Sequence, residues 1–218
     1  MRKPAICASI INNDLTVIKA TEPLVDFFEV RIDIIGDGWQ DLVQQLEKPW
    51  IACNRIKVEG GSWQGNEARR KEELLKAIQL GASIIDIELS TPNLSKIVPL
   101  VKKRAKCLLS FHDFKETLPS KALSKIVKRQ LESGADICKV ITYATNAEDN
   151  LAILKLILDF PKQNIIAFAM GPLGMSSRIL SPLVGGYMTY ASIKKGEQSA
   201  PGQMAVSQIH SLYKMVFR

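Results

Sequence analysis

The sequence predicts an α/β protein built as one closed (β/α)8 barrel. Short apolar runs rich in β-branched residues alternate eight times with segments of helical spacing along the 218 residues. The connections between these segments are short, and strands that alternate with helices in this way pair in parallel. Eight such units are what a closed barrel needs, and the chain length is near the lower end of the usual range. We therefore expect a single-domain (β/α)8 TIM barrel over residues 1–218.

The predicted strands follow the apolar runs in chain order. They cover residues 6–10, 27–33, 50–55, 84–89, 107–112, 137–142, 165–170 and 186–193. The predicted helices lie between them, at residues 14–20, 41–46, 67–79, 94–104, 121–132, 147–158, 175–180 and 203–216. Gly81 and Gly134 each follow a predicted helix. A left-handed glycine at this position ends a helix and leads into the next strand.

The composition is typical of one compact unit, with 46% hydrophobic and 23% charged residues and no long polar linker. No apolar run approaches the roughly 20 residues of a membrane span, and the first residues lead directly into strand-like sequence without a signal-peptide pattern. We therefore expect a cytoplasmic protein without a membrane partner. The four cysteines form no CxxC pair and lie in apolar runs, so we expect reduced core residues. With two histidines, we also expect no metal site.

The formal charge of +7 allows nucleic acid, anionic lipid or a small anionic substrate as partner. The basic residues are scattered, and their clusters, at residues 69–71, 102–104 and 194–195, contain no interleaved aromatic residues. We interpret most of them as solvated helix faces. A nucleic-acid-binding module stays as an alternative that a salt titration of binding would test.

One lysine, Lys139, lies inside the run ADICKVIT (135–142), which otherwise reads as a buried strand. A buried ammonium group needs a partner or a task. Desolvation favours the neutral amine, which attacks carbonyl groups, so one interpretation is a lysine that forms a Schiff base. The other interpretation is a lysine at a strand end whose ammonium group reaches solvent.

The predicted strand ends are unusually polar, and in a barrel of this kind the chemistry lies at the carboxyl ends of the strands. In EVRID, Glu29, Arg31 and Asp33 are spaced by two and share one face of a strand. An ion-pair ladder inside the barrel and contacts to a ligand both explain this pattern. His112 ends the apolar run LLSFH and is a candidate general base. Together with Lys139 it would place a nucleophile and a base in one barrel mouth.

Six motifs in order resemble the type I 3-dehydroquinate dehydratases, a family of (β/α)8 lyases of the shikimate pathway that use a lysine Schiff base and no cofactor. The motifs are EVRID, CNRIKVEGG, SFHDF, ADICKVIT, AMGPLGMSSR and SAPGQ, and they span nearly the whole chain. Two departures stand out. The first strand begins at Ile6 without the longer N-terminal extension common in bacterial members, so something shorter must close the barrel floor. The spacer before SAPGQ is also slightly long.

The resemblance implies a hydro-lyase that converts 3-dehydroquinate to 3-dehydroshikimate, with Lys139 as the Schiff-base nucleophile and His112 as the general acid and base. Glu59 would orient His112. The implied substrate-binding residues are Ser9, Glu29, Arg31, Arg55, Arg178, Ser199 and Gln203. Four other acidic residues are expected to play supporting roles, namely Asp33, Asp86, Glu88 and Asp113.

The resemblance also implies a small-molecule substrate, 3-dehydroquinate, and no nucleic-acid partner, and it leaves a homodimer open. The main alternative is a class I Schiff-base aldolase that acts on a sugar phosphate. Such an enzyme would bind phosphate through backbone groups after the seventh and eighth strands. Here the same region offers the side chains of Arg178, Ser199 and Gln203, which suit a carboxylate.

Overall fold

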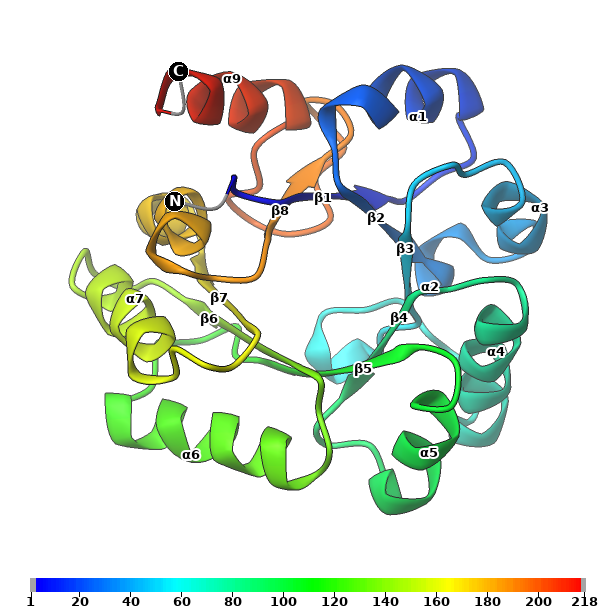
Figure 1. Ribbon diagram of the computed structural model, residues 1–218, viewed down its shortest axis with the longest axis horizontal. Coiled ribbons are helices and arrows are strands. Elements are labelled where there is room, and N and C mark those ends of the chain that lie inside the picture. The colour runs from blue at the N-terminus through cyan, green and yellow to red at the C-terminus, as the bar shows by residue number, and fades with distance from the viewer. Residues whose placement is uncertain (1–2, 217–218) are drawn as a thin grey trace.

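The computed structural model describes residues 3–216 and forms a barrel of parallel strands inside a ring of helices (Figure 1). The strand order is β7-β6-β5-β4-β3-β2-β1-β8, so each strand lies beside its neighbours in the chain. Each crossover runs along the outside of the sheet, as in right-handed βαβ units. The predicted (β/α)8 architecture is therefore confirmed.

The strands and helices have the following bounds. The strands are β1 (Ile6–Ile10), β2 (Phe27–Arg31), β3 (Trp50–Cys53), β4 (Ile84–Glu88), β5 (Lys106–His112), β6 (Ile137–Tyr143), β7 (Ile165–Met170) and β8 (Thr189–Ser192). The α-helices are α1 (Leu15–Thr21), α2 (Ile32–Ile35), α3 (Trp39–Val43), α4 (Glu67–Gln79), α5 (Leu94–Val101), α6 (Ser120–Glu132), α7 (Asp149–Asp159), α8 (Met175–Leu180) and α9 (Val206–Val216). Short 3-10 turns are η1 (Glu22–Leu24), η2 (Lys57–Glu59), η3 (Pro172–Gly174) and η4 (Ser181–Val184).

The sheet is nearly closed between its two end strands. β1 pairs with both β2 and β8, and seven parallel pairings run from β7 round to β8. Between β7 and the approach to β8, the Tyr187 N–H donates to the Ile165 carbonyl at 2.7 Å. No helix of residues 3–216 is long and apolar enough to cross a membrane.

Alternation along the strands divides the core into an inner and an outer layer. On β3, Ile51 packs inside the barrel, whereas Trp50 and Ala52 pack outward against the helices. The same alternation brings polar residues inward toward the carboxyl ends of the strands, where they can line a pocket. All four cysteines are buried and unpaired, as expected for core residues.

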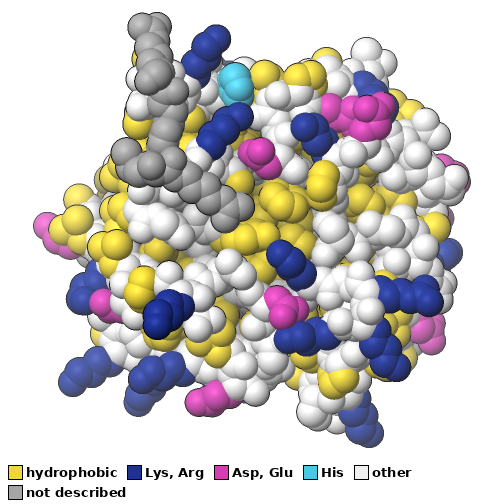
Figure 2. Space-filling view, viewed as in Figure 1, with side chains coloured by type: hydrophobic (Ala, Val, Ile, Leu, Met, Phe, Trp, Pro, Cys, Tyr) yellow, Lys and Arg dark blue, Asp and Glu magenta, His cyan; other side chains and the backbone are white. Residues whose placement is uncertain are grey.

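The amino-terminal end of the barrel is closed by side chains of the strands themselves. The rings of Phe27 and Tyr187 pack with centroids 6.4 Å apart, and Lys106 lies over the Tyr187 ring at 5.9 Å. Figure 2 shows hydrophobic side chains at the centre of this face, with charged side chains around them.

Several predicted boundaries are wrong, among them the following three. The second strand ends at Arg31 rather than at residue 33, because Asp33 lies in α2 and its carboxylate accepts two hydrogen bonds from the Arg31 guanidinium. The last strand begins at Thr189 rather than at residue 186. The last helix begins at Val206 rather than at residue 203, because the Ser192 N–H donates to the Met204 carbonyl and holds that segment extended.

Candidate active site

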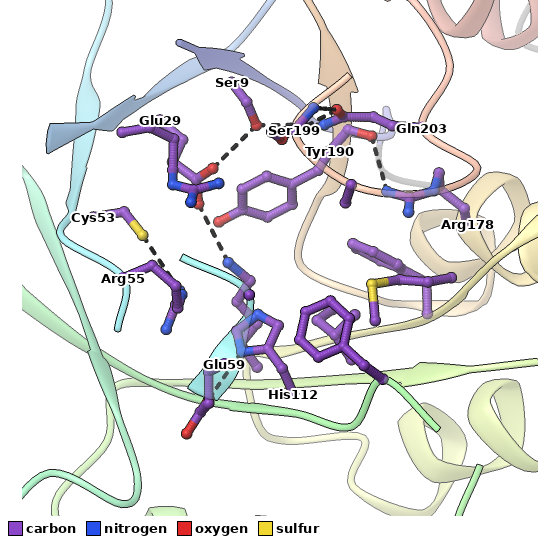
Figure 3. Close-up of a pocket in the computed structure, with 18 residues that line it drawn as sticks. Ser9, Glu29, Cys53, Arg55, Glu59, His112, Arg178, Tyr190, Ser199 and Gln203 are labelled. Carbon is purple, nitrogen blue, oxygen red and sulfur yellow. Dashed lines mark hydrogen bonds and ion pairs between the residues drawn. The ribbon is translucent and has the colours of Figure 1, made fainter. Parts of the chain in front are cut away.

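A pocket of about 470 Å³ opens at the carboxyl ends of the strands (Figure 3). Its lining includes all ten residues that were predicted from the sequence to be catalytic or to bind substrate. They come from at least seven separate segments of the chain. They are Ser9, Glu29, Arg31, Arg55, Glu59, His112, Lys139, Arg178, Ser199 and Gln203.

Lys139 lies on β6 with only 4% of its surface exposed, so its ammonium group does not reach solvent. Its Nζ donates to Asp86 Oδ2 at 2.9 Å and to Glu29 Oε1 at 3.3 Å. The Tyr190 ring lies beneath it, with Nζ 4.4 Å from the ring centroid. On the outer side, the buried amide of Gln130 donates to the Lys139 carbonyl at 2.9 Å and fixes the backbone. The lysine is therefore held rigidly inside the barrel mouth.

The charge state of Lys139 differs from what burial alone predicts. Burial lowers the pKa of the Lys139 ammonium, but the carboxylates of Asp86 and Glu29 raise it more, and the net shift is upward. Before a ligand binds, Lys139 is therefore a paired ammonium rather than a free amine. The pKa of Asp86 shifts downward, because Arg55 and Lys139 outweigh the effect of its burial.

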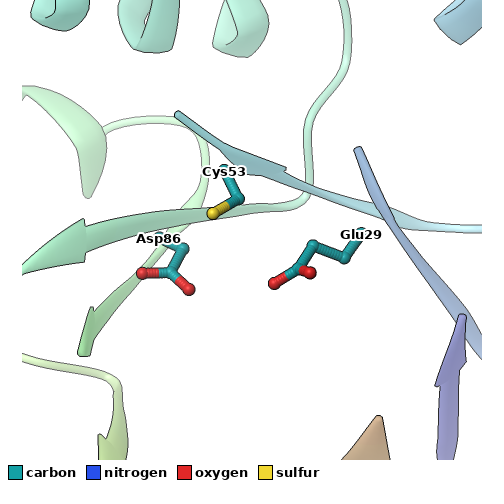
Figure 4. A group of neighbouring side chains, drawn as sticks. All are labelled: Glu29, Cys53 and Asp86. Carbon is teal, nitrogen blue, oxygen red and sulfur yellow. The ribbon is translucent and has the colours of Figure 1, made fainter. Parts of the chain in front are cut away.

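Three possible metal ligands gather at the same place. Oxygen and sulfur atoms of Glu29, Cys53 and Asp86 lie within 4.8 Å of one another (Figure 4). Two cations of the chain already balance this group, since Lys139 Nζ contacts both carboxylates and Arg55 Nη2 lies 2.6 Å from Asp86 Oδ2 and 3.3 Å from Cys53 Sγ. The donor set thus serves the two side-chain cations.

His112 and Glu59 form a second unit in the pocket. His112 ends β5, and its Nδ1 lies 3.0 Å from Glu59 Oε2. Glu59 also accepts a hydrogen bond from Ser90 at 2.9 Å. The two glycines after Glu59 allow this geometry, because Gly60 has a φ of +78° and a Cβ on Gly61 would lie 1.9 Å from the Arg55 carbonyl oxygen.

Burial controls the protonation of this pair. Burial, together with the positive charges of Arg55 and Lys139, lowers the pKa of His112 well below its ordinary value. Burial also raises the pKa of Glu59 to about 7, against the opposing effect of Arg55. A neutral imidazole with a carboxylate at Nδ1 is suited to accept a proton at Nε2.

Arg178 on α8 is a buried cation that makes weak contacts only. Its guanidinium lies over the Phe168 ring at 4.2 Å and donates to the carbonyls of Tyr190 and Pro201 at 3.4 Å each. Among residues 3–216 it has no carboxylate partner, and its Nε makes no hydrogen bond. Burial lowers the pKa of Arg178 to about 9. Such a group is a natural partner for an anionic ligand.

The remaining predicted residues are connected to each other. Gln203 accepts hydrogen bonds from the N–H and Oγ of Ser199 at 2.8 and 3.1 Å, and its amide donates to Ser9 Oγ at 3.4 Å. Ser9 in turn donates to Glu29 Oε2 at 3.0 Å. Arg31 is held by the carboxylate of Asp33 through two hydrogen bonds, at 2.7 and 2.9 Å.

Three residues that contact the cations of the site were not assigned to it from the sequence. Asp86, expected to play a supporting role, contacts Lys139 directly. Tyr190 and Phe168 supply the rings under Lys139 and Arg178. Alternation along β4, β7 and β8 marks these three positions as inward-facing, but it does not show which cation each one meets.

The chain matches the family model of type I 3-dehydroquinase over residues 6–218. A 3-dehydroquinate dehydratase of Dehalococcoides mccartyi is 43% identical over 217 residues, which cover 99% of this chain and 97% of the relative. One of Methanocaldococcus jannaschii is 33% identical, with 97% and 98% covered. The chain belongs to the type I 3-dehydroquinase family. Its membership makes it a hydro-lyase of the shikimate pathway and decides against the class I aldolase.

Solved structures agree with the family assignment. The type I 3-dehydroquinate dehydratase of Clostridium difficile superimposes with a TM-score of 0.88 at 25% identity, covering 99% of this chain and 93% of that one. The 3-dehydroquinate dehydratase of Aquifex aeolicus has the same fold, with a TM-score of 0.84 at 24% identity over 98% and 99% of the two chains. The type I 3-dehydroquinase barrel is thus retained over its whole length.

Proposed function

We propose that this chain removes water from 3-dehydroquinate to give 3-dehydroshikimate through an imine on Lys139. The observation that carries the proposal is the composition of one pocket, which holds a buried lysine, a histidine–carboxylate pair and an arginine that has no carboxylate partner within residues 3–216. These three groups match a ketone, an acidic C–H bond and a carboxylate on one small ring. The Clostridium difficile relative was solved with covalently modified comenic acid, which supports covalent chemistry in this family.

In the proposed first step, the Lys139 amine attacks the C3 ketone, and loss of water gives the imine. The ammonium must first lose a proton, and Asp86 at 2.9 Å and Glu29 at 3.3 Å are the nearby acceptors. The imine then accepts the electron pair that is left when a proton leaves C2. This removes the main energetic barrier to breaking a C–H bond next to a carbonyl carbon.

His112 is proposed to take the C2 proton and to return a proton to the hydroxyl that leaves from C1. A C1–C2 double bond forms and one water departs, after which hydrolysis of the imine releases the conjugated ketone and restores Lys139. Glu59 would hold the Nδ1 hydrogen of His112, which keeps Nε2 free for the transfer. Neutral His112 is the protonation state that the first transfer requires.

Substrate binding is assigned to the cationic and polar residues of the lining. Arg178 would bind the substrate carboxylate, with Ser199 and Gln203 from the loop beside it. Arg31, Arg55 and Glu29 would hold ring hydroxyls, with Ser9 at the base of the pocket.

The test is borohydride reduction in the presence of 3-dehydroquinate, followed by peptide mass mapping. We expect a reduced adduct on the peptide that contains Lys139, and none in Lys139→Ala. An adduct on Lys194 or Lys195 instead would overturn the assignment. Substrate-free borohydride treatment is the control for chemical background.

A further inference from the structure

Arg70 on α4 is a completely buried cation outside the pocket. Its guanidinium makes five hydrogen bonds with four partners, including Glu88 Oε2 at 2.6 Å and the Asn54 carbonyl at 3.1 Å. The neighbouring residue Arg69 is exposed on the same helix. Arg70 therefore belongs to the barrel interior rather than to a solvated helix face.

An alternating series of charges leads from Arg70 to Lys139. Glu88 is shared, because its Oε2 contacts Arg70 and its Oε1 accepts from Arg55 Nη1 at 3.1 Å. Arg55 Nη2 donates to Asp86 Oδ2 at 2.6 Å, and the same oxygen accepts from Lys139 Nζ at 2.9 Å. Every member is at most 4% exposed, so water screens these contacts weakly.

We propose that Arg70 is a positioning residue that holds Glu88 and thereby keeps Arg55 on Asp86, which limits how strongly Asp86 binds the Lys139 ammonium. The inference rests on the proposed function, in which Lys139 must lose a proton before it attacks the substrate. Arg70 touches neither Lys139 nor the pocket, so it acts through Glu88 and Arg55.

The direction of the effect follows from the charges. Without Arg70, Glu88 has Arg55 as its remaining guanidinium partner and draws it away from Asp86. Asp86 then pairs more strongly with Lys139, and the loss of a nearby positive charge acts in the same direction. The ammonium form becomes more stable, so less free amine is present at a given pH.

Other groups also face Lys139 and must stay constant in the test. Glu29 comes from β2, Cys53 from β3, His112 from β5 and Tyr190 from β8. A comparison of variants that leave these four residues unchanged reports the Arg70 contribution alone. Loss of thermal stability does not distinguish a positioning role from a structural one. Removing an Arg70 with a purely structural role would also destabilise the fold.

The experiment is a single-turnover measurement of imine formation, trapped with borohydride on the Lys139 peptide at several pH values from 7 to 9. In Arg70→Met we expect about tenfold less adduct formed per unit time, equivalent to a shift of about one pH unit toward alkaline pH. Arg69→Met removes the same charge at the exposed neighbouring position and should follow the wild-type pH profile. An Arg70→Met profile that coincides with wild type would overturn the proposal and leave Arg70 with a structural role.

Glu88→Gln provides a second arm with the opposite sign. Removing this carboxylate lets Arg55 pair more fully with Asp86, so the profile should shift toward lower pH. If Arg70→Met does not fold, an unchanged profile in Glu88→Gln overturns the proposal, and an acid shift supports it. Absence of any Lys139 adduct in the wild-type enzyme would instead mean that the proposed function has failed.

Discussion

Nδ1 of His112 lies 3.0 Å from Oε2 of Glu59, deep in the pocket. Burial lowers the pKa of His112 and raises the pKa of Glu59, so it favours the neutral form of both groups. A neutral imidazole is the form that can act as a base. Near neutral pH the imidazole is neutral, and Glu59 changes from carboxylic acid to carboxylate as the pH passes about 7. The carboxylate can act only as an acceptor, so it fixes the hydrogen on Nδ1 and leaves Nε2 free to take a proton, whereas the carboxylic acid can also donate to Nδ1.

The first prediction is that kcat/KM rises through about pH 7 with the ionisation of Glu59. Glu59→Gln should lose this limb of the profile and should lower kcat by roughly 10- to 100-fold, because an amide does not enforce the required tautomer. The measurement is kcat/KM between pH 5 and 9, followed by the ultraviolet absorbance of the conjugated product. The same limb in Glu59→Gln would show that another group titrates there.

The same variant has a stability signature. The pKa of Glu59 is raised in the folded state, so the unfolded chain loses this proton first and folding becomes less favourable as the pH rises from about 4.5 to about 7. Glu59→Gln removes this loss. Its Tm relative to wild type should therefore be higher at pH 8 than at pH 5, and the reverse order would contradict the raised pKa.

A second prediction separates the two histidines of the chain. His112→Ala should lower kcat by roughly 100- to 10,000-fold but still form a borohydride adduct on Lys139, because the nucleophile remains. His210 lies on α9 at the opposite end of the barrel, and His210→Ala is the matched control with wild-type turnover expected. Equal losses of turnover in both variants would refute His112 as the base.

The third prediction concerns Arg178, whose positive charge is buried without a carboxylate partner in the part of the chain that the structure describes. Arg178→Met should weaken binding of product or of a carboxylate analogue by roughly 10- to 100-fold, the effect of about 1.5–3 kcal/mol expected for a hydrogen bond to a charged group. Titration calorimetry measures it. Lys103→Met removes one positive charge from an exposed site outside the pocket lining and should bind as wild type does.

Arg178→Met should also be more stable than wild type without ligand, with a Tm roughly 2–5 °C higher at pH 7. Burial lowers the pKa of Arg178 to about 9, so at pH 7 the folded protein carries a charge that the unfolded chain holds at lower cost. A less stable Arg178→Met would mean that the contacts to Phe168 and the two carbonyls outweigh the desolvation cost.

The fold and the pocket residues could be predicted because they depend on local patterns. Alternation and strand ends are visible in the chain, and they locate inward-facing residues such as Glu29 and His112 without knowledge of their partners. The end of β2 was not predictable in this way. IDII continues a strand-like run, yet the chain turns into α2 because the Arg31 guanidinium binds the Asp33 carboxylate two residues later.

Charge partners that come from distant segments of the chain could not be predicted from the sequence either. Arg70 was grouped with a solvated basic cluster, since helical spacing does not show that Glu88 and the Asn54 carbonyl meet it inside the barrel. Similarly, the run around Lys139 indicates burial but not the two carboxylates that keep it charged. Both errors have one cause, because these partners are up to 110 residues away in the chain.

The last prediction is that the loop after β8 closes over the bound ligand. Its base is already held, because Pro201 accepts from the Gly171 N–H at 3.3 Å and Gln203 contacts both Ser199 and Ser9. Its tip, residues 194–198, is mostly exposed and has one ion pair, between Lys194 and Glu197 at 2.9 Å. A ligand carboxylate at Arg178 would give this loop a new partner inside the pocket.

Amide hydrogen exchange of residues 195–200, with and without product, measures this closure. We expect at least several-fold slower exchange with product, and a smaller change in Gln203→Ala, which lacks the amide that ties Ser199 to Ser9. Segment 145–149, an exposed turn held by Asp149 and outside the pocket lining, serves as the internal control. Closure would shield the imine from water and strengthen the charge contacts around Arg178. Equal exchange in both states would mean that the loop is a fixed wall of the pocket, and the roles proposed for Lys139 and His112 would then operate in a site open to water.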